Sequence, residues 1–168
     1  MKKVLFFVDD NYEDLELWYP KIRLEEASYS TVIAAIHKNK EFKGKHGYPC
    51  KADIAVDEVN TDEFAALVIP GGFSPDKLRR NKTVLDITAK IFNQNKLVAF
   101  ICHAGWVPIS AKIVKEKNVT SVEAIKDDLE NAGAIWQNKA VVVDENLISS
   151  RTPKDLPEFL KSILKWLS

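Results

Sequence analysis

The sequence LVAFICHAG, at residues 97–105, leads from five consecutive apolar residues into a cysteine, a histidine and two small residues. An apolar run of this length is typical of a strand that is buried on both faces of a parallel sheet. Ala104 and Gly105 leave room for a helix directly after the strand, so the stretch predicts a sharp strand-to-helix turn, an elbow, with Cys102 at its tip. The dipole and free N–H groups of that helix start would favour the thiolate. The alternative is a buried, inert cysteine.

Similar apolar runs recur along the chain and alternate with stretches of helical periodicity. The further predicted strands are residues 4–8, 31–36, 66–69 and 140–143. The predicted helices, with apolar residues spaced three and four apart, are residues 15–27, 84–92 and 153–167. Pro20 lies inside the first of these helices, where it predicts either a break or a helix that begins at the proline.

This alternation predicts an α/β fold. Strand–helix–strand units with right-handed crossovers build a doubly wound three-layer sandwich around a mostly parallel sheet. Residues 38–56 interrupt the pattern and contain Gly44, Gly47 and Pro49, so they predict an inserted hairpin. A chain of 168 residues without linker, repeat or low-complexity tract is expected to form a single domain over residues 1–168.

The composition argues against several classes of partner. Lys and Arg together number 24, as do Asp and Glu, so the formal charge is zero and no basic run points to nucleic acid. No apolar stretch is long enough for a membrane helix or a signal peptide, so we expect no membrane association. Cys50 and Cys102 are then expected to be free thiols in the cytoplasm. An uncharged surface also makes self-association easier.

In doubly wound folds, sites form beyond the carboxyl ends of the strands. Residues 9–16, 70–76 and 102–106 each follow a predicted strand and are therefore expected to meet. Most acidic residues of the first segment should serve the helix start or solvation. Glu13 and Glu16 are the candidates for one carboxyl group beside the cysteine. Burial would raise the pKa of that group, and the protonated acid could donate to the thiolate or exchange a proton.

The segment Pro70-Gly-Gly72 offers backbone donors on the other side of the thiol. Glycines let the backbone approach a substrate, and the N–H groups of Gly72 and His103 could form an oxyanion hole. Neither G-x-G-x-x-G nor G-x-x-x-x-G-K-[ST] occurs, and no set of His, Cys and carboxylate residues has metal-ligand spacing. We therefore expect no cofactor and no metal.

The chain has three histidines that could assist a cysteine nucleophile. His37 and His46 fall in a predicted loop and a predicted turn, where a solvated or turn-forming role is expected. His103, next to Cys102, is the candidate acid–base partner. Glutaminases built on this scaffold and papain-like proteases need a histidine well downstream of the cysteine, and none follows residue 103. The sequence excludes those two mechanisms.

Six motifs, taken together, resemble the PfpI intracellular-protease branch of the ThiJ/PfpI superfamily. They are Asn11-Tyr-Glu-Asp-Leu-Glu-Leu-Trp-Tyr-Pro20, Gly44-Lys-His-Gly-Tyr48, Pro70-Gly-Gly72, Ala99-Phe-Ile-Cys-His103, Ile125-Lys-Asp-Asp128 with Asn131-Ala-Gly133, and Ser149-Ser-Arg-Thr-Pro153. The match runs in register from the first strand to the last helix. It implies a flavodoxin-like, class I glutamine-amidotransferase-like sandwich with the cysteine at the elbow.

The resemblance also implies roles for individual residues. A glutamate of the first motif contacts the thiol in this family, and Glu16 corresponds best, with Glu13 nearby. His103 would receive a carboxylate from a neighbouring subunit, and Asp76 stands where these proteins carry that acid. A homodimer or a higher homo-oligomer would then be part of the chemistry.

The sequence departs from the family pattern at three places. After Cys-His the family usually continues Gly-Pro, whereas residues 104–106 read Ala-Gly-Trp. Asp76 is one methylene shorter than the usual glutamate, and Val122 stands where a tyrosine often lines the pocket. The shape of the pocket and the distance from His103 to its acid are therefore expected to differ. Trp106 either narrows the site or packs outward against a partner subunit.

The expected function is that of a cysteine-dependent enzyme acting on reactive carbonyls. The resemblance implies glyoxalase III or protein-deglycase chemistry in stress protection, with a small aldehyde or a glycated substrate. An intracellular cysteine peptidase of the PfpI type, with a peptide substrate, is the enzymatic alternative. A stress protein without enzymatic activity, acting as a redox sensor or chaperone through an oxidisable Cys102, is the alternative from another class.

Overall fold

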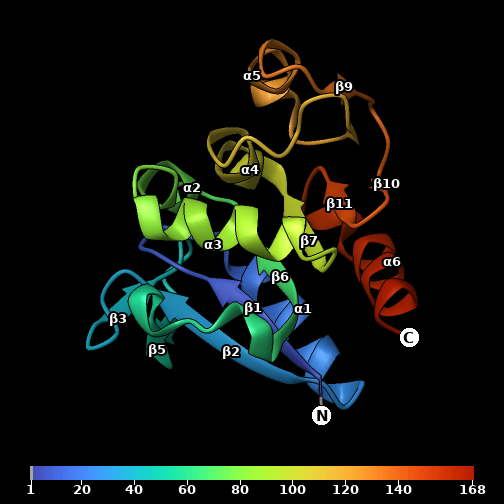
Figure 1. Ribbon diagram of the computed structural model, residues 1–168. Helices are drawn as coiled ribbons and strands as arrows, with labels where there is room; N and C mark the ends of the chain where they lie inside the picture. Colours follow the sequence, from blue (N-terminus) through green and yellow to red (C-terminus); the bar gives the residue numbers. More distant parts are fainter. Residues whose placement is uncertain (1) are drawn as a thin grey trace.

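A computed structural model describes residues 2–168, which build a central seven-stranded sheet with helices around it (Figure 1). The strand order is β10-β11-β7-β6-β1-β2-β5. All neighbours are parallel except β10 and β11, which are antiparallel. The strands are β1 (Lys3–Phe7), β2 (Ser30–Ala35), β5 (Ile54–Ala55), β6 (Phe64–Ile69), β7 (Leu97–Ile101), β10 (Val141–Asp144) and β11 (Leu147–Ser150).

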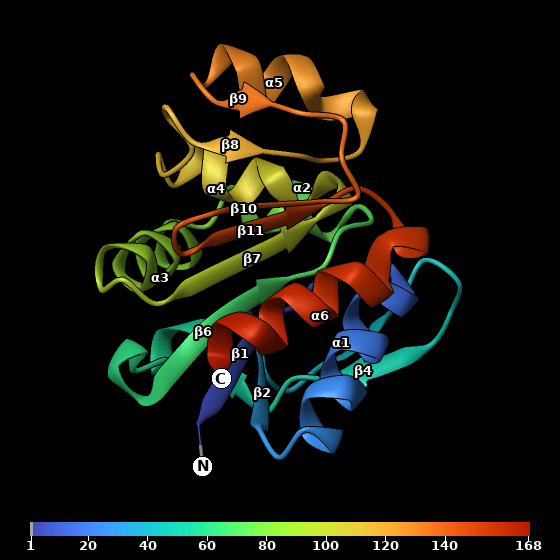
Figure 2. The same cartoon turned by 90° about the vertical axis from the view of Figure 1, so that its right-hand side faces the viewer.

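The helices cover both faces of this sheet, as the alternation predicted. They are α1 (Asp14–Glu26), α2 (Ser74–Leu78), α3 (Lys82–Asn93), α4 (Trp106–Ser110), α5 (Lys126–Asn131) and α6 (Leu156–Leu167). Helices α1 and α6 pack side by side on one face, and α3 packs on β6 and β7 from the other (Figure 2). Alternate residues of β1 serve the two cores: Val4 and Phe6 face α1 and α6, and Leu5 and Phe7 face α3. The predicted doubly wound sandwich is confirmed.

Two small sheets flank the large one. One is the predicted hairpin, formed by β3 (Glu41–Lys43) and β4 (Pro49–Lys51). The other pairs β8 (Asn118–Val119) with β9 (Ile135–Trp136), next to α5. The predicted insertion was too long, because Ile54 and Ala55 form β5 at the edge of the main sheet, parallel to β2.

The expectation for the last strand was incomplete. Residues 140–143 are not a central buried strand; β10 lies at the sheet edge and runs antiparallel to β11. The buried strand is β11, which ends in two serines and so lacks an apolar signal. Both serines are satisfied by hydrogen bonds: Ser149 Oγ accepts the N–H of Thr120 at 2.8 Å, and Ser150 Oγ donates to the carbonyl of Ala140 at 2.8 Å.

Both expectations for Pro20, a break or a helix that begins at the proline, were wrong, since α1 is continuous from Asp14 to Glu26. A proline inside a helix cannot donate the hydrogen bond that the preceding turn expects. Here Leu17, Pro20 and Leu24 form the buried side of α1, and the helix packs against α6. This burial outweighs the loss of one backbone hydrogen bond.

The start of α1 also fastens the hairpin. The buried Asp14 carboxylate accepts the backbone N–H groups of His46 and Tyr48, each at 2.9 Å. A Cβ on Gly44 would lie 2.3 Å from Asp14 Oδ1, so only glycine allows this approach. Within residues 2–168, none of the helices combines the length and the apolar character needed to cross a membrane.

Candidate active site

The predicted elbow is present at the end of β7. A 3-10 turn over Cys102–Gly105 leads directly into α4. Cys102 has φ 61°, a left-handed conformation that costs a residue with a Cβ about 1–2 kcal/mol. The turn can lie close to its neighbours because Gly105 is small: a Cβ there would lie 3.0 Å from Ile125 Cδ1 and 3.3 Å from Phe100 Cε2.

Glu16 reaches the elbow from α1 and is completely buried. Its Oε2 accepts the N–H of Gly71 at 2.7 Å, whereas Oε1 has no hydrogen-bond partner among the described residues. Gly71 lies between this carboxyl group and the elbow, and the space between them is small. A Cβ on Gly71 would lie 2.6 Å from Glu16 Oε2 and 2.9 Å from Cys102 Cβ. Glu16 and Cys102 therefore meet at a position where only glycine fits.

Burial determines the charge of Glu16. It raises the pKa of this carboxyl group to about 8, with the nearby Glu13 adding to the rise and the Gly71 N–H opposing it. At pH 7 the group carries a proton. The catalytic role of Glu16 as a protonated acid beside the thiol stays a prediction.

The pKa of Cys102 is nevertheless raised above that of a free thiol. Burial, and then the negative charge of Glu16, raise the pKa of Cys102 to about 12. The helix α4 has only five residues and follows a 3-10 turn, so its dipole is small. A protonated Glu16 removes one of these causes, because a neutral carboxyl group does not repel a thiolate. The two groups therefore ionise as a coupled pair in which the loss of one proton makes the second loss harder.

Two backbone donors face the sulfur and oppose that rise. Hydrogen bonds from the N–H groups of His103 and Gly72 both lower the pKa of Cys102. Gly72 has φ 80°, and a Cβ there would lie 2.4 Å from the carbonyl oxygen of Asn11. The loop can adopt this approach only with glycine at this position. These are the two N–H groups that the sequence suggested for an oxyanion hole.

His103 lies half-buried beside the sulfur. Its Nδ1 is 3.4 Å from Cys102 Sγ, and its ring centroid is 5.2 Å from that of Trp106. Burial lowers the pKa of His103, and the positive charge of Lys45 lowers it further, so the imidazole is neutral at pH 7.

Glu13 and Asp76 make their contacts away from the Cys102 sulfur. Glu13 Oε2 caps α1 by accepting the N–H of Glu16 at 2.9 Å, and its Oε1 lies 3.8 Å from His46 Nε2. Asp76 is exposed on α2 and pairs with Arg80 at 3.0 Å. Within residues 2–168 it makes no contact with His103. Its role as an acid for a neighbouring subunit stays a prediction.

One side-chain set in the described part of the chain could hold a metal ion, and sequence spacing did not reveal it. Ligand atoms of Glu13, Asp14 and His46 lie within 4.8 Å of one another. Both carboxylate oxygens of Asp14 already accept backbone N–H groups, however, and the set lies at the start of a helix, where the dipole disfavours a cation. We therefore assign no metal to it.

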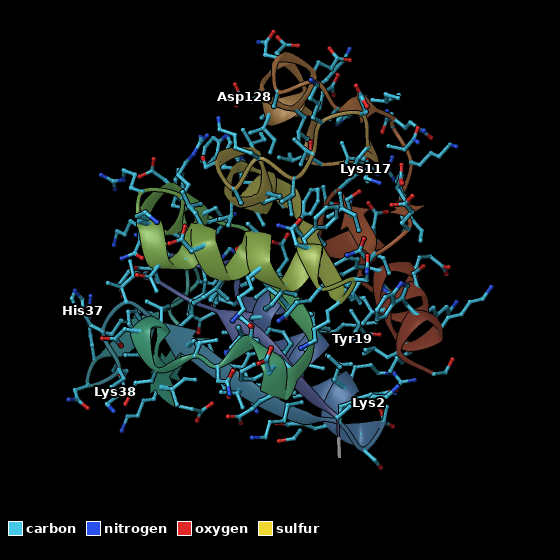
Figure 3. All side chains as sticks on the ribbon, viewed as in Figure 1. Lys2, Tyr19, His37, Lys38, Lys117 and Asp128 are labelled. Carbon is cyan, nitrogen blue, oxygen red and sulfur yellow. The ribbon has the colours of Figure 1, made fainter. Side chains whose placement is uncertain are left out.

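Sequence reasoning missed Lys45. It lies in the hairpin loop, and its N–H donates to the carbonyl of Tyr12 at 2.8 Å. Its positive charge lowers the pKa of Glu16, Cys102 and His103, so it lies within electrostatic range of all three groups. The motif Gly-Lys-His-Gly contained this lysine, but nothing in the sequence placed the hairpin over the elbow. His37, by contrast, is exposed on the loop after β2 beside Lys38, as expected (Figure 3).

The raised pKa of Glu16 predicts a pH-dependent cost to stability. The folded protein keeps a proton on Glu16 up to about pH 8, whereas an exposed glutamate releases it near 4.5. The contribution of Glu16 to the free energy of unfolding is fully present below pH 4.5. It falls by roughly 1.4 kcal/mol per pH unit as the pH rises from there toward 8. The Glu16→Gln variant does not titrate there. Its melting temperature relative to the parent protein should rise between pH 5 and pH 9, and a constant difference would contradict a protonated Glu16.

Comparison with known proteins places this geometry in a family. The profile of the DJ-1/PfpI family matches residues 2–166. A deglycase of Pyrococcus furiosus is 44% identical over 165 residues, covering 98% of this chain and 99% of that protein. A deglycase of Thermococcus kodakarensis is 45% identical with the same coverage. A Bacillus subtilis protein named as a candidate cysteine protease is 42% identical over 167 residues, covering 99% of this chain and 98% of that one.

Solved structures agree in fold. A ThiJ/PfpI domain protein from Brachyspira murdochii has a TM-score of 0.93 at 25% identity, with 98% of this chain and 95% of that one covered. A two-domain protein from Anabaena variabilis, with DJ-1/ThiJ/PfpI-like and ferritin-like domains, has a TM-score of 0.98 at 39% identity. That match covers 99% of this chain and 48% of the other, so the chain spans about half its length. With the resemblance confirmed over nearly every residue, this chain belongs to the DJ-1/PfpI family.

Proposed function

We propose that this protein is a cysteine-dependent enzyme of the PfpI type that acts on reactive carbonyls, as a deglycase with glyoxalase III-like chemistry. The observation that carries the proposal is the buried, protonated Glu16 facing the Cys102 thiol beside two backbone N–H groups. Relatives named as deglycases, 43–45% identical over nearly the whole chain, support the same chemistry.

The first step forms a bond between sulfur and carbon. The neutral His103 imidazole, whose Nδ1 lies 3.4 Å from Cys102 Sγ, takes the thiol proton, and the sulfur attacks the aldehyde carbon of methylglyoxal. The carbonyl oxygen becomes an oxyanion held by the N–H groups of Gly72 and His103. Glu16 gives its proton to this oxygen, which yields a hemithioacetal. With a glycated amine as substrate, the same carbon exchanges its C–N bond for the C–S bond, and the amine leaves with a proton from His103 or Glu16.

The second step is an internal oxidation and reduction that needs no external oxidant. The Glu16 carboxylate takes the proton from the carbon bonded to sulfur and returns it to the neighbouring ketone carbon, while the hydroxyl proton on the first carbon moves to the ketone oxygen. The product is a thioester of a 2-hydroxy acid. Water then cleaves the C–S bond, and lactate and the free thiol are released.

One comparison favours the peptidase alternative, since the Bacillus subtilis relative is named as a candidate cysteine protease. Peptide cleavage also needs a proton for the leaving amine, for which His103 and Glu16 are the candidate donors. An assay of the purified protein with methylglyoxal, run beside a casein digest, tests the proposal. We expect D- or L-lactate from methylglyoxal and no casein fragments; casein cleavage without lactate would overturn the proposal in favour of the peptidase.

We also propose that the protein works as a homodimer or higher homo-oligomer, in the cytoplasm. Apolar side chains lie exposed on α1 and the hairpin loop, namely Leu15, Tyr19, Ile22 and Tyr48 (Tyr19 is labelled in Figure 3). Burying them against a second copy would remove apolar area from water. Both thiols are free, which fits a reducing compartment. A solution mass of one chain in light scattering would remove both the assembly and the role of Asp76 in a neighbouring site.

A further inference from the structure

The His103 ring lies against Trp106, which follows it by one turn of the elbow. The two ring centroids are 5.2 Å apart at an interplanar angle of 57°. Besides Nδ1 near the sulfur, the imidazole has no hydrogen bond within residues 2–168. A ring with a single polar contact can rotate about its side-chain bonds. The side chain packed against it, here the Trp106 indole, then decides which nitrogen faces the thiol.

Trp106 is itself fixed by groups from two other elements. Its Nε1 donates to Asp128 Oδ2 on α5 at 2.9 Å (Asp128 is labelled in Figure 3). The guanidinium carbon of Arg79, at the end of α2, lies 5.6 Å from the ring centroid, and Arg79 Nε donates to Ser110 Oγ at 3.0 Å. The indole is thus held at its edge by an acceptor and at its face by a cation.

We propose that Trp106, anchored by Asp128, is a positioning residue that holds the His103 imidazole against the Cys102 thiol from within the same chain. The departure from the family pattern at residues 104–106 then has a role in the site, because it supplies the tryptophan that positions His103. The inference rests on the proposed function for its kinetic readout only. The thiol and the imidazole can be observed without any turnover.

The charges around His103 make such support useful. The positive charge of Lys45, in the hairpin loop, disfavours protonation of the imidazole. When His103 takes a proton during the reaction, the π face of Trp106 stabilises the imidazolium. Asp128 accepts from the indole N–H and Arg79 lies over the indole ring, whereas Glu16, on α1, acts on the sulfur of Cys102.

Asp128 offers a sharp test because it is exposed, so its substitution should leave the core unchanged. Asp128→Ala removes the acceptor, whereas Asp128→Asn keeps an oxygen that accepts from Trp106 Nε1. Asp127→Ala removes the neighbouring exposed carboxylate and serves as a matched control. Three quantities are measured for each protein: kcat/KM for methylglyoxal against pH, the alkylation rate of Cys102 by iodoacetamide, and the His103 tautomer from long-range ¹H–¹⁵N NMR correlations.

We expect Asp128→Ala to lower kcat/KM by roughly 10- to 100-fold, as a misplaced acid–base group does. Cys102 alkylation should slow in the same variant, and the single His103 tautomer should become a mixture. Asp128→Asn should restore all three values to within about twofold of the parent protein, and Asp127→Ala should leave them unchanged.

A loss of melting temperature with an unchanged tautomer and alkylation rate would overturn the inference, since Trp106 would then serve packing alone. If neither the parent protein nor any variant turns over methylglyoxal, the proposed function fails. The NMR and alkylation results still decide the positioning role in that case.

Discussion

Replacement of Glu16 by Gln lowers aldehyde turnover by roughly 10²–10⁴-fold, the range expected for the loss of a general acid–base group. The amide keeps the shape of the side chain, and its oxygen can still accept the Gly71 N–H that Glu16 Oε2 accepts at 2.7 Å. Its NH₂ group then takes the place of Oε1, which has no hydrogen-bond partner among the described residues. An amide cannot give up and recover a proton, so both proton transfers of the proposed reaction stop.

The thiol should remain reactive in this variant. A protonated Glu16 and a glutamine are both neutral at pH 7, and above about pH 8 the substitution removes the negative charge that helps to raise the pKa of Cys102. Alkylation of Cys102 should therefore continue at a near-normal or higher rate while turnover fails. In the parent protein, kcat/KM should rise as pH approaches 8, where the coupled pair loses its first proton.

Two further variants complete this experiment. Glu26→Gln makes the same substitution at the exposed end of α1 and should leave turnover unchanged. Glu13→Gln tests the second acidic candidate, which the structure places as the cap of α1. If Glu13→Gln removed turnover and Glu16→Gln did not, the assignment would be wrong by one helical turn. If neither mattered, His103 would be the proton shuttle and Asp76→Asn the next substitution.

Periodicity was enough to predict the layers of the fold, because apolar runs of strand length and amphipathic stretches are local signals. It failed where the decisive interaction is tertiary. Pro20 looks like a helix break, yet the helix continues because its other residues are buried. The strand β11 ends in Ser149 and Ser150, whose hydroxyl groups find partners that only the folded chain supplies.

The same distinction applies to the site. The elbow could be predicted, since a strand, a nucleophile and two small residues are adjacent in sequence. The acidity of Cys102 could not, because it depends on burial and on Glu16, a residue from another element. Lys45 escaped notice for the same reason: the hairpin that carries it is fastened by Asp14, through contacts across about thirty residues of sequence.

The site therefore concentrates features that oppose stability. Glu16 is buried with one oxygen unpaired, Cys102 has a left-handed backbone, and Gly71 separates them with no room for a methyl group. Each of these costs folding free energy. Together they keep a protonated acid and a desolvated thiol in contact, an arrangement that a stable core alone would not retain.

Replacement of Cys102 by Ser should abolish turnover, by at least about 10⁴-fold, as the loss of a covalent nucleophile does in other enzymes. Serine fits the elbow in size, but its hydroxyl group ionises far less readily than a thiol. Cys50→Ser is the matched control and should retain turnover, since Cys50 lies on β4 and is only 2% exposed, whereas Cys102 is partly exposed. Iodoacetamide at neutral pH should therefore label Cys102 well before Cys50, as mapped by mass spectrometry. Equal labelling of the two thiols, or turnover that survives Cys102→Ser, would contradict the elbow nucleophile. Selective labelling without turnover of methylglyoxal or casein would instead favour the redox-sensing alternative, because an accessible thiol serves oxidation as well as catalysis.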